Sequence, residues 1–183
     1  MQRATRHGGF TLVETLVAIS ILTIVIVGPF QIIQGVLQSS YNARDQLIAT
    51  SLAQEALEYV RQVRDSNFLY NLNNGGAGRT WLYGFDGTMS STNCGVDGSV
   101  VACVVDPALL TITLCSGTDC SALPLKMSAK NVYTQSAGGT TPFTRSVQFI
   151  PISSHEMLVK VTVSWSNHGA QSVVLTENIQ DWL

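Results

Sequence analysis

Residues 9–27 read GFTLVETLVAISILTIVIV, and from residue 10 onward this stretch is apolar except for one glutamate and four hydroxyl side chains. An α-helix rises about 1.5 Å per residue, so about twenty helical residues cross a hydrocarbon core of about 30 Å. We therefore expect residues 10–30 to form a transmembrane helix. The remaining part of the 183-residue chain is long enough for one domain of ordinary size.

The charges that flank the apolar segment predict its orientation. Arg3 and Arg6 precede the segment, and no charged residue occurs between Glu14 and Arg44. Under the positive-inside rule, this asymmetry holds the N-terminus in the cytoplasm and places the rest of the chain outside. The formal net charge is -2 and only 12% of the residues are charged, so no basic field attracts phosphate backbones. Nucleic acid is therefore disfavoured as a partner.

A cleavable secretory signal peptide is the alternative for the apolar segment, and the residues that follow it disfavour this interpretation. Gly28-Pro29 and further apolar residues come next, with no Ala-x-Ala pattern for a signal peptidase. The small residues that do suit cleavage, Gly8-Gly9, lie before the apolar run. Cleavage there would leave the hydrophobic helix on a mature chain that begins at Phe10.

The hexapeptide GFTLVE at residues 9–14, followed by an apolar helix, resembles the leader junction of type IV prepilins and of the pseudopilins of type II secretion. The resemblance is close over about residues 1–35 and looser over the following helix. It implies that residues 1–9 are a leader peptide and that a membrane-embedded prepilin peptidase cuts after Gly9. It also implies that the same enzyme N-methylates Phe10, and that Glu14 takes part in assembly.

Glu14 also calls for an explanation on physical grounds, because a carboxylate inside an apolar membrane helix costs about 2.5–3.5 kcal/mol on insertion scales. Two explanations are open. The side chain reaches the headgroups near the cytoplasmic end of the helix, or it pairs with the Phe10 amine of a neighbouring subunit, as the resemblance implies. In the second explanation, pairing removes the free-energy cost of leaving the carboxylate and the amine without partners in the membrane. The same contact sets the register between subunits.

Residues 31–68 are predicted to form an amphipathic helix that packs on a sheet. Apolar side chains recur with a period near 3.6, which is typical of a helix with one buried face. The predicted stripe consists of Ile48, Leu52, Ala56, Tyr59, Val60 and Val63. Gln54 and Glu55 are expected to be solvated. Binding of a partner is the alternative use of the stripe.

Residues 69–183 are predicted to form a β-rich extracytoplasmic head. Short β-like runs bounded by glycine-containing turns occur at residues 80–85, 99–105, 109–115, 145–150, 157–165 and 171–176. The last two runs should form a hairpin, and alternation predicts that Val159, Val161, Val163 and Trp165 are buried. The predicted fold class is α+β: a long N-terminal helix, half transmembrane and half amphipathic, packed on a C-terminal antiparallel β-sheet in a pilin-like layout.

Four cysteines, Cys94, Cys103, Cys115 and Cys120, lie within residues 94–120 and permit three pairings. The short intervening loops favour Cys94–Cys103 and Cys115–Cys120, although the sequence does not strictly choose. An exported location favours oxidation. A four-cysteine zinc site is the alternative, but the spacings lack the paired Cys-x-x-Cys-type knuckles of structural zinc sites.

No sequence motif predicts catalysis, a cofactor or a metal site. The histidines, His7, His155 and His168, lie outside the known nucleophile and metal-ligand motifs. A serine, His155 and a glutamate occur together at residues 153–156, but side chains so close in sequence rarely face one another as a triad. Oxygen-bearing side chains at Asp86, Asn93 and Asp97 do not follow the EF-hand pattern. The chain is therefore not expected to be an enzyme.

Two function classes follow. The first is a structural subunit, and a minor one, of a type IV pilus or a type II secretion pseudopilus. The resemblance implies as partners the prepilin peptidase and methylase, other pilin or pseudopilin subunits, and an inner-membrane assembly platform, with the helix in the lipid bilayer. The expected location is the inner membrane, single-pass, and then the filament. The alternative is a membrane-tethered binding or adhesion domain that does not polymerise.

Overall fold

The computed structural model describes residues 9–76, 78–89, 92–167 and 169–181. Most of the predicted leader, with Arg3 and Arg6, therefore lies outside the described residues. The chain divides into two compact units, Met1–Arg44 and Asp45–Leu183. Each unit is described by itself below.

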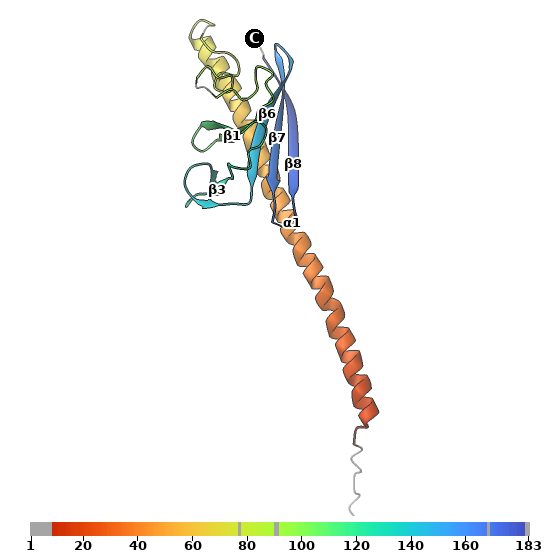
Figure 1. Ribbon diagram of the computed structural model, residues 1–183. Helices are drawn as coiled ribbons and strands as arrows, with labels where there is room; N and C mark the ends of the chain where they lie inside the picture. Colours follow the sequence, from red (N-terminus) through yellow and green to blue (C-terminus); the bar gives the residue numbers. More distant parts are fainter. Residues whose placement is uncertain (1–8, 77, 90–91, 168, 182–183) are drawn as a thin grey trace, which may run out of the picture. The chain divides into compact units, whose positions relative to one another are not determined.

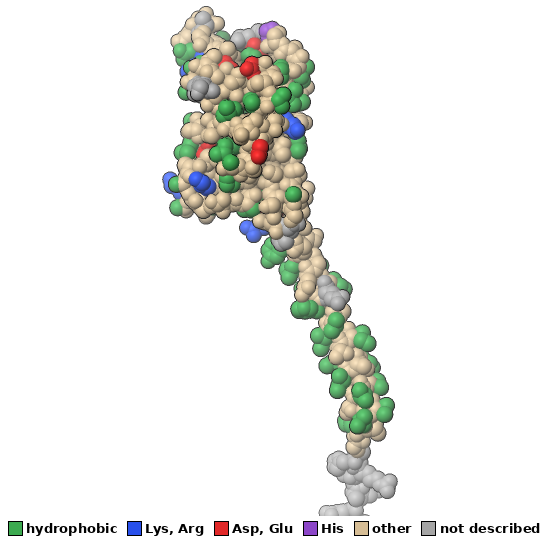
Figure 2. Space-filling view, in the orientation of Figure 1, with side chains coloured by type: hydrophobic (Ala, Val, Ile, Leu, Met, Phe, Trp, Pro, Cys, Tyr) green, Lys and Arg blue, Asp and Glu red, His purple; other side chains and the backbone are tan. Residues whose placement is uncertain are grey.

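One helix, α1 (Leu12–Asn73), contributes to both units. In the first unit its apolar side chains are exposed, as Figure 2 shows along this part of the helix. The helix is long and apolar enough to cross a membrane. Pro29 lies inside it, where proline removes one backbone hydrogen bond from the helical ladder.

In the second unit, α1 buries one face. The buried side chains are Ala49, Leu52, Ala53, Ala56, Tyr59 and Val60, with Ile48 and Val63 partly buried against the same cluster. The stripe predicted from the 3.6 period is therefore confirmed. Small alanines at three of these positions allow the helix backbone to approach the sheet closely.

The helix packs on a sheet of five antiparallel strands in the order β2-β1-β6-β7-β8 (Figure 1). Their bounds are β1 Cys103–Asp106, β2 Thr111–Leu114, β6 Thr144–Ser153, β7 Glu156–Trp165 and β8 Gln171–Gln180. A smaller antiparallel sheet has the order β4-β3-β5, with β3 Lys126–Met127, β4 Tyr133–Thr134 and β5 Gly139–Thr140. The α+β layout of one long N-terminal helix and a C-terminal antiparallel sheet is confirmed.

Strand β7 carries the clearest alternation of the sheet. Val159, Val161, Val163 and Trp165 are buried, whereas Lys160 and Thr162 between them are only partly covered. Because side chains on a strand point to alternate faces, every second residue meets α1 and the core. The predicted hairpin of the last two runs is present as β7–β8, paired from Glu156–Gln180 to Trp165–Gln171.

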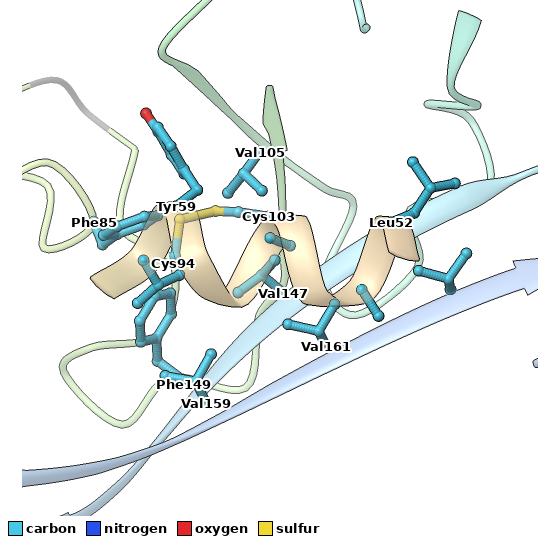
Figure 3. Packing of buried hydrophobic residues seen from close by; sticks show 14 of the residues in the cluster. Leu52, Tyr59, Phe85, Cys94, Cys103, Val105, Val147, Phe149, Val159 and Val161 are labelled. Atoms are coloured by element: carbon cyan, nitrogen blue, oxygen red, sulfur yellow. A yellow bond between two sulfur atoms is a disulfide. The ribbon is translucent and has the colours of Figure 1, made fainter. Parts of the chain in front are cut away.

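The core lies between α1 and the sheet, and Figure 3 shows part of it. Phe85 occupies its centre, with its ring centroid 4.9 Å from that of Phe149 and 6.1 Å from that of Tyr59. Burial of apolar area stabilises the unit by about 25 cal/mol per Å².

Three local predictions differ from the structure. Residues 80–85 form turns, not a strand, although Leu82 and Phe85 are fully buried. The predicted run 99–105 becomes a strand only from Cys103 onward. Strands β3, β4 and β5 were not predicted, because two-residue strands carry no periodicity that a sequence pattern can reveal.

The prediction that Glu55 is simply solvated is wrong. Its carboxylate accepts a hydrogen bond from Nη1 of Arg145 across 2.6 Å, and Arg145 is fully buried. The pairing crosses 90 residues of sequence, so helical periodicity alone gave no signal of it.

Candidate functional site

The helix begins immediately after the junction singled out by the sequence. Gly9, Phe10 and Thr11 are not helical, and α1 starts at Leu12. Oγ1 of Thr11 accepts a hydrogen bond from the backbone N–H of Glu14 at 3.3 Å. Thr11 is therefore the N-cap of α1, because its side chain satisfies one of the free N–H groups of the first turn.

This cap is a feature that the sequence reasoning missed. A threonine followed three residues later by a glutamate, as in Thr11 and Glu14, is the sequence signature of a capping box. The same pattern could have placed the helix start one residue after Thr11. The cap also explains why Gly9 and Phe10 stay outside the helix.

The bond between Gly9 and Phe10 lies in exposed, non-helical chain. The Phe10 side chain is 81% exposed, and a Cβ added at Gly9 would meet nothing within 4 Å. A proteolytic enzyme binds its substrate in an extended conformation, and this junction needs no unwinding of the helix to adopt one. Among the described residues, therefore, no packing contact restricts position 9 to glycine.

Glu14 lies in the first turn of α1 and is exposed. A carboxylate there is favoured by the partial positive charge of the helix N-terminus. Among the residues that the structure describes, no side chain pairs with Glu14. The carboxylate is therefore available to a group outside this chain, such as an amine.

All four cysteines form disulfides in the structure. Cys94 is joined to Cys103 and Cys115 to Cys120, with Cα–Cα distances of 5.5 Å and 5.0 Å. The thiolates that a zinc site would need are therefore engaged. The first bridge lies in the main core and ties the loop before β1 to that strand. The second closes a turn next to a small separate cluster that includes Ala102 and Val104.

The side-chain oxygens of Asp86 and Asn93 accept hydrogen bonds from residues nearby in sequence. Asp86 accepts hydrogen bonds from the hydroxyls of Thr80 and Thr88 and from the Thr88 N–H. Oδ1 of Asn93 accepts from the backbone N–H groups of Gly95 and Val96. These hydrogen bonds engage the oxygens of Asp86 and Asn93 that a bound cation would need.

Burial raises the pKa of Asp86, but the hydrogen bonds from Thr80 and Thr88 stabilise its charged form more strongly. Its pKa is therefore lowered from the ordinary value.

His155 does not form a triad with its sequence neighbours. Its Nδ1 lies 3.5 Å from Oδ2 of Asp181, and its ring is largely exposed. Its backbone N–H donates to Oγ of Ser153, so the serine contacts the main chain of residue 155 and not its imidazole. His7 and His168 lie outside the described residues.

One comparison with known proteins gave a match. The model of the prokaryotic N-terminal methylation motif matches residues 5–28, which contain the Gly9–Phe10 junction, Thr11 and Glu14. Neither curated proteins nor solved structures gave a match to the chain. With its α+β layout of one long apolar helix and a C-terminal antiparallel sheet, the chain carries the N-terminal cleavage and methylation signal of type IV pilins and pseudopilins.

Proposed function

We propose that this protein is a structural subunit, and a minor one, of a type IV pilus or a type II secretion pseudopilus. The observation that carries the proposal is the methylation motif at residues 5–28. The motif overlaps the start of a helix that is long and apolar enough to span a membrane. The alternative class, a tethered binding domain that never polymerises, also needs an anchor. It does not need a processed and methylated N-terminus.

Processing is the first step of the proposed function. A prepilin peptidase cuts between Gly9 and Phe10, and the new amine of Phe10 is N-methylated. The N-cap at Thr11 supports this step, because it keeps both residues of the junction outside the helix. Removal of residues 1–9 takes away Arg3 and Arg6, so the formal side-chain charge changes from -2 to -4.

Assembly is the second step. In the membrane, the carboxylate of Glu14 pairs with the Phe10 amine of a neighbouring subunit while the apolar helices pack side by side. An ion pair in a medium of low dielectric is favourable only when both charges find partners, so this contact also sets the register between neighbours. The first unit supports this step with its exposed apolar side chains and an unpaired Glu14 among the described residues.

The proposed location follows from these steps. The precursor spans the inner membrane once, with its N-terminus in the cytoplasm and the second unit outside, and it then enters the filament. The two disulfides support an extracytoplasmic location, because disulfides persist in oxidising compartments. Partners are the prepilin peptidase and methylase, other subunits and an inner-membrane assembly platform.

The junction can be tested by expressing the full chain together with a prepilin peptidase and measuring the intact mass. The wild-type product should begin at Phe10 with one added methyl group, and Gly9→Val should leave the precursor uncut. Because a Cβ added at position 9 meets no atom of the described residues within 4 Å, loss of cleavage would report recognition and not misfolding. Gly8→Ala is the matched control and should be processed normally. A wild-type product that retains Met1 would overturn the proposal.

A further inference from the structure

A pocket of about 280 Å³ lies in the second unit, beside the C-terminal part of α1. Its lining includes Tyr59 and Val63 from the helix, Arg79 and Tyr83 from the turns that follow, and Leu110 and Ile112 at the β1–β2 connection. Neither the N-terminal motif nor the proposed assembly uses these residues. Tyr59, Arg79 and Tyr83 among them carry side-chain hydrogen-bond donors.

Tyr59 is anchored in the core but keeps its hydroxyl free. The residue is only 5% exposed, and its ring packs edge-to-face on Phe85. Its hydroxyl points away from the core cluster in Figure 3, and no residue within the described part of the chain hydrogen-bonds to it. Burial, and to a lesser degree the negative charge of Asp106, raises the pKa of Tyr59. The phenol is therefore protonated at neutral pH and can donate to a ligand.

Arg79 is the second donor. Its guanidinium lies over the Tyr70 ring at 3.8 Å from the centroid and over the Tyr83 ring at 4.9 Å. The side chain of Asn71 holds its backbone, donating to the Arg79 carbonyl at 2.8 Å and accepting from the Arg79 N–H at 3.1 Å. Stacking engages the faces of the guanidinium and leaves the N–H groups at its edges available.

No carboxylate among the described residues pairs with Arg79. The nearest buried acid to Tyr59, Asp106, already accepts four hydrogen bonds: from the N–H groups of Ala108 and Leu109, the Thr134 hydroxyl and the Gln135 N–H. The Tyr59 hydroxyl and the Arg79 guanidinium are therefore available to an acceptor from outside the chain. The positive charge of Arg79 favours an anionic one.

The rest of the lining is mixed, with the polar side chains of Gln62, Ser66, Asn67 and Tyr83 beside apolar ones. Val63 and Ile112 form part of its wall, and Leu110 stands at its rim with 64% of its surface exposed. Leu110 has a φ of 55°, a left-handed conformation that is unfavourable for a residue with a branched side chain. Backbone strain of this kind concentrates at binding sites, where the surrounding structure holds it in place.

We propose that this pocket binds the C-terminal residue of another polypeptide when that residue is apolar. The volume lies just below the range of about 300–1,000 Å³ of pockets that enclose small molecules, so it suits one residue of a chain. Only at a C-terminus do a main-chain carboxylate and an apolar side chain share one Cα. The carboxylate accepts from Arg79 and Tyr59, and the side chain contacts the apolar wall. Binding here does not depend on whether the protein polymerises.

The test uses the full chain in detergent micelles and isothermal titration with short peptides. Acetyl-Ala-Ala-Phe with a free carboxylate should bind with a Kd on the order of 1 mM, as its size allows. The same peptide with a C-terminal amide should bind at least about tenfold more weakly, because it loses a charge-assisted hydrogen bond. Acetyl-Ala-Ala-Ala with a free carboxylate should also bind more weakly, because it does not fill the apolar part.

Variants assign the binding to the pocket. Tyr59→Phe keeps the ring in the core and removes only the hydroxyl, so it should weaken binding about tenfold with an unchanged unfolding midpoint. Arg79→Gln should weaken it by at least as much. Lys130→Gln, which removes an exposed cation outside the pocket, is the control and should bind as the wild type does.

Three results would overturn the proposal. The first is equal binding of the acid and the amide, or no saturation at about ten times the expected Kd. The second is an unchanged affinity of Tyr59→Phe for the tripeptide acid. This result would overturn the proposal even if Arg79→Gln is too unstable to be measured. The third is N-acetylphenylalanine binding more tightly than the tripeptide acid, which would assign the pocket to a small carboxylic acid and not to a polypeptide.

Discussion

The guanidinium of Arg145 on strand β6 donates a hydrogen bond to the carboxylate of Glu55 on helix α1 across 2.6 Å. The same side chain also donates to the Leu52 carbonyl on α1 at 3.0 Å and to the Val105 carbonyl on β1 at 2.6 Å. Arg145 is fully buried, while the side chain of Glu55 is 39% exposed. One cation therefore joins the helix to two strands of the sheet through the middle of the core.

Replacement of Arg145 should strongly destabilise the second unit. Arg145→Met removes the side-chain donor to each of two buried carbonyls and leaves Glu55 without its partner, so we expect a loss of about 3 kcal/mol in the free energy of unfolding. Urea unfolding of the full chain in detergent, followed by tryptophan fluorescence, reports this unit, because all three tryptophans follow residue 80.

Arg61→Met provides the matched control for Arg145. Arg61 pairs with Glu58 and Glu177, but its side chain is 40% exposed. Exposed ion pairs contribute about 0.2–1 kcal/mol, so this variant should lose much less stability. Equal losses in the two variants would contradict the role assigned to Arg145.

Asp106 should be the second polar anchor of the unit. It is buried and accepts four hydrogen bonds, which join the β1–β2 turn to strand β4. Asp106→Ala should therefore lower the free energy of unfolding by about 2–3 kcal/mol. Asp119→Ala, which removes an exposed carboxylate that caps one backbone N–H in its own turn, should change it by less than about 0.5 kcal/mol.

The two disulfides should differ in their resistance to reduction. Cys94 and Cys103 are fully buried in the main core, whereas the bridge from Cys115 to Cys120 closes a turn whose four intervening residues are exposed. A thiol reagent needs the core to open before it reaches the first bridge. Timed dithiothreitol treatment, alkylation and peptide mass mapping should find Cys115 and Cys120 labelled first. The reverse order would contradict this description.

Loss of either bridge should also affect stability. The chain-entropy model gives about 2–3 kcal/mol for loops of this length. Replacing Cys94 and Cys103 by alanine should cost more than replacing Cys115 and Cys120, because the first pair also fills space in the main core. Urea unfolding of both double variants checks the order.

Acid should weaken the loop around Asp86. Its pKa is lowered from 3.8 in the folded chain, so its stabilising contribution is present above that value and is lost as the pH falls through the folded-state pKa. Asp86→Asn should be less stable than the wild type at neutral pH, and the difference should shrink as the pH falls below 3.8 and through the lowered folded-state pKa. Unfolding free energies measured across this range test the sign. A difference that grows in acid would refute it.

Glu14 should matter for assembly and not for membrane insertion. Glu14→Leu makes the helix more apolar, so the variant should enter the membrane as the wild type does. Its recovery in sheared filaments should fall at least about tenfold, because the amine of a neighbouring subunit loses its partner. Ser20→Ala is the control, since the Ser20 hydroxyl bonds only to the Val17 carbonyl of its own helix. Unaltered filament recovery would remove Glu14 from the mechanism.

Features set by short-range patterns could be predicted from the sequence. The apolar run, the GFTLVE junction and the alternation in β7 each occupy one continuous segment, so periodicity and residue type suffice to identify them. The Thr11 cap belongs to the same class, because its signal lies within four residues. The junction, the helix and the hairpin each depend on residues that are close together in the sequence.

The sequence by itself determined the N-terminal signal, the membrane-length helix and the α+β class of this protein. Only the tertiary structure decided that Glu55 meets Arg145, that Asp106 anchors strand β4, and that Tyr59 and Arg79 line one pocket. Each of these relationships joins residues that are at least 20 positions apart in the sequence. The packing of the folded chain, and not residue type or local spacing, brings such side chains together.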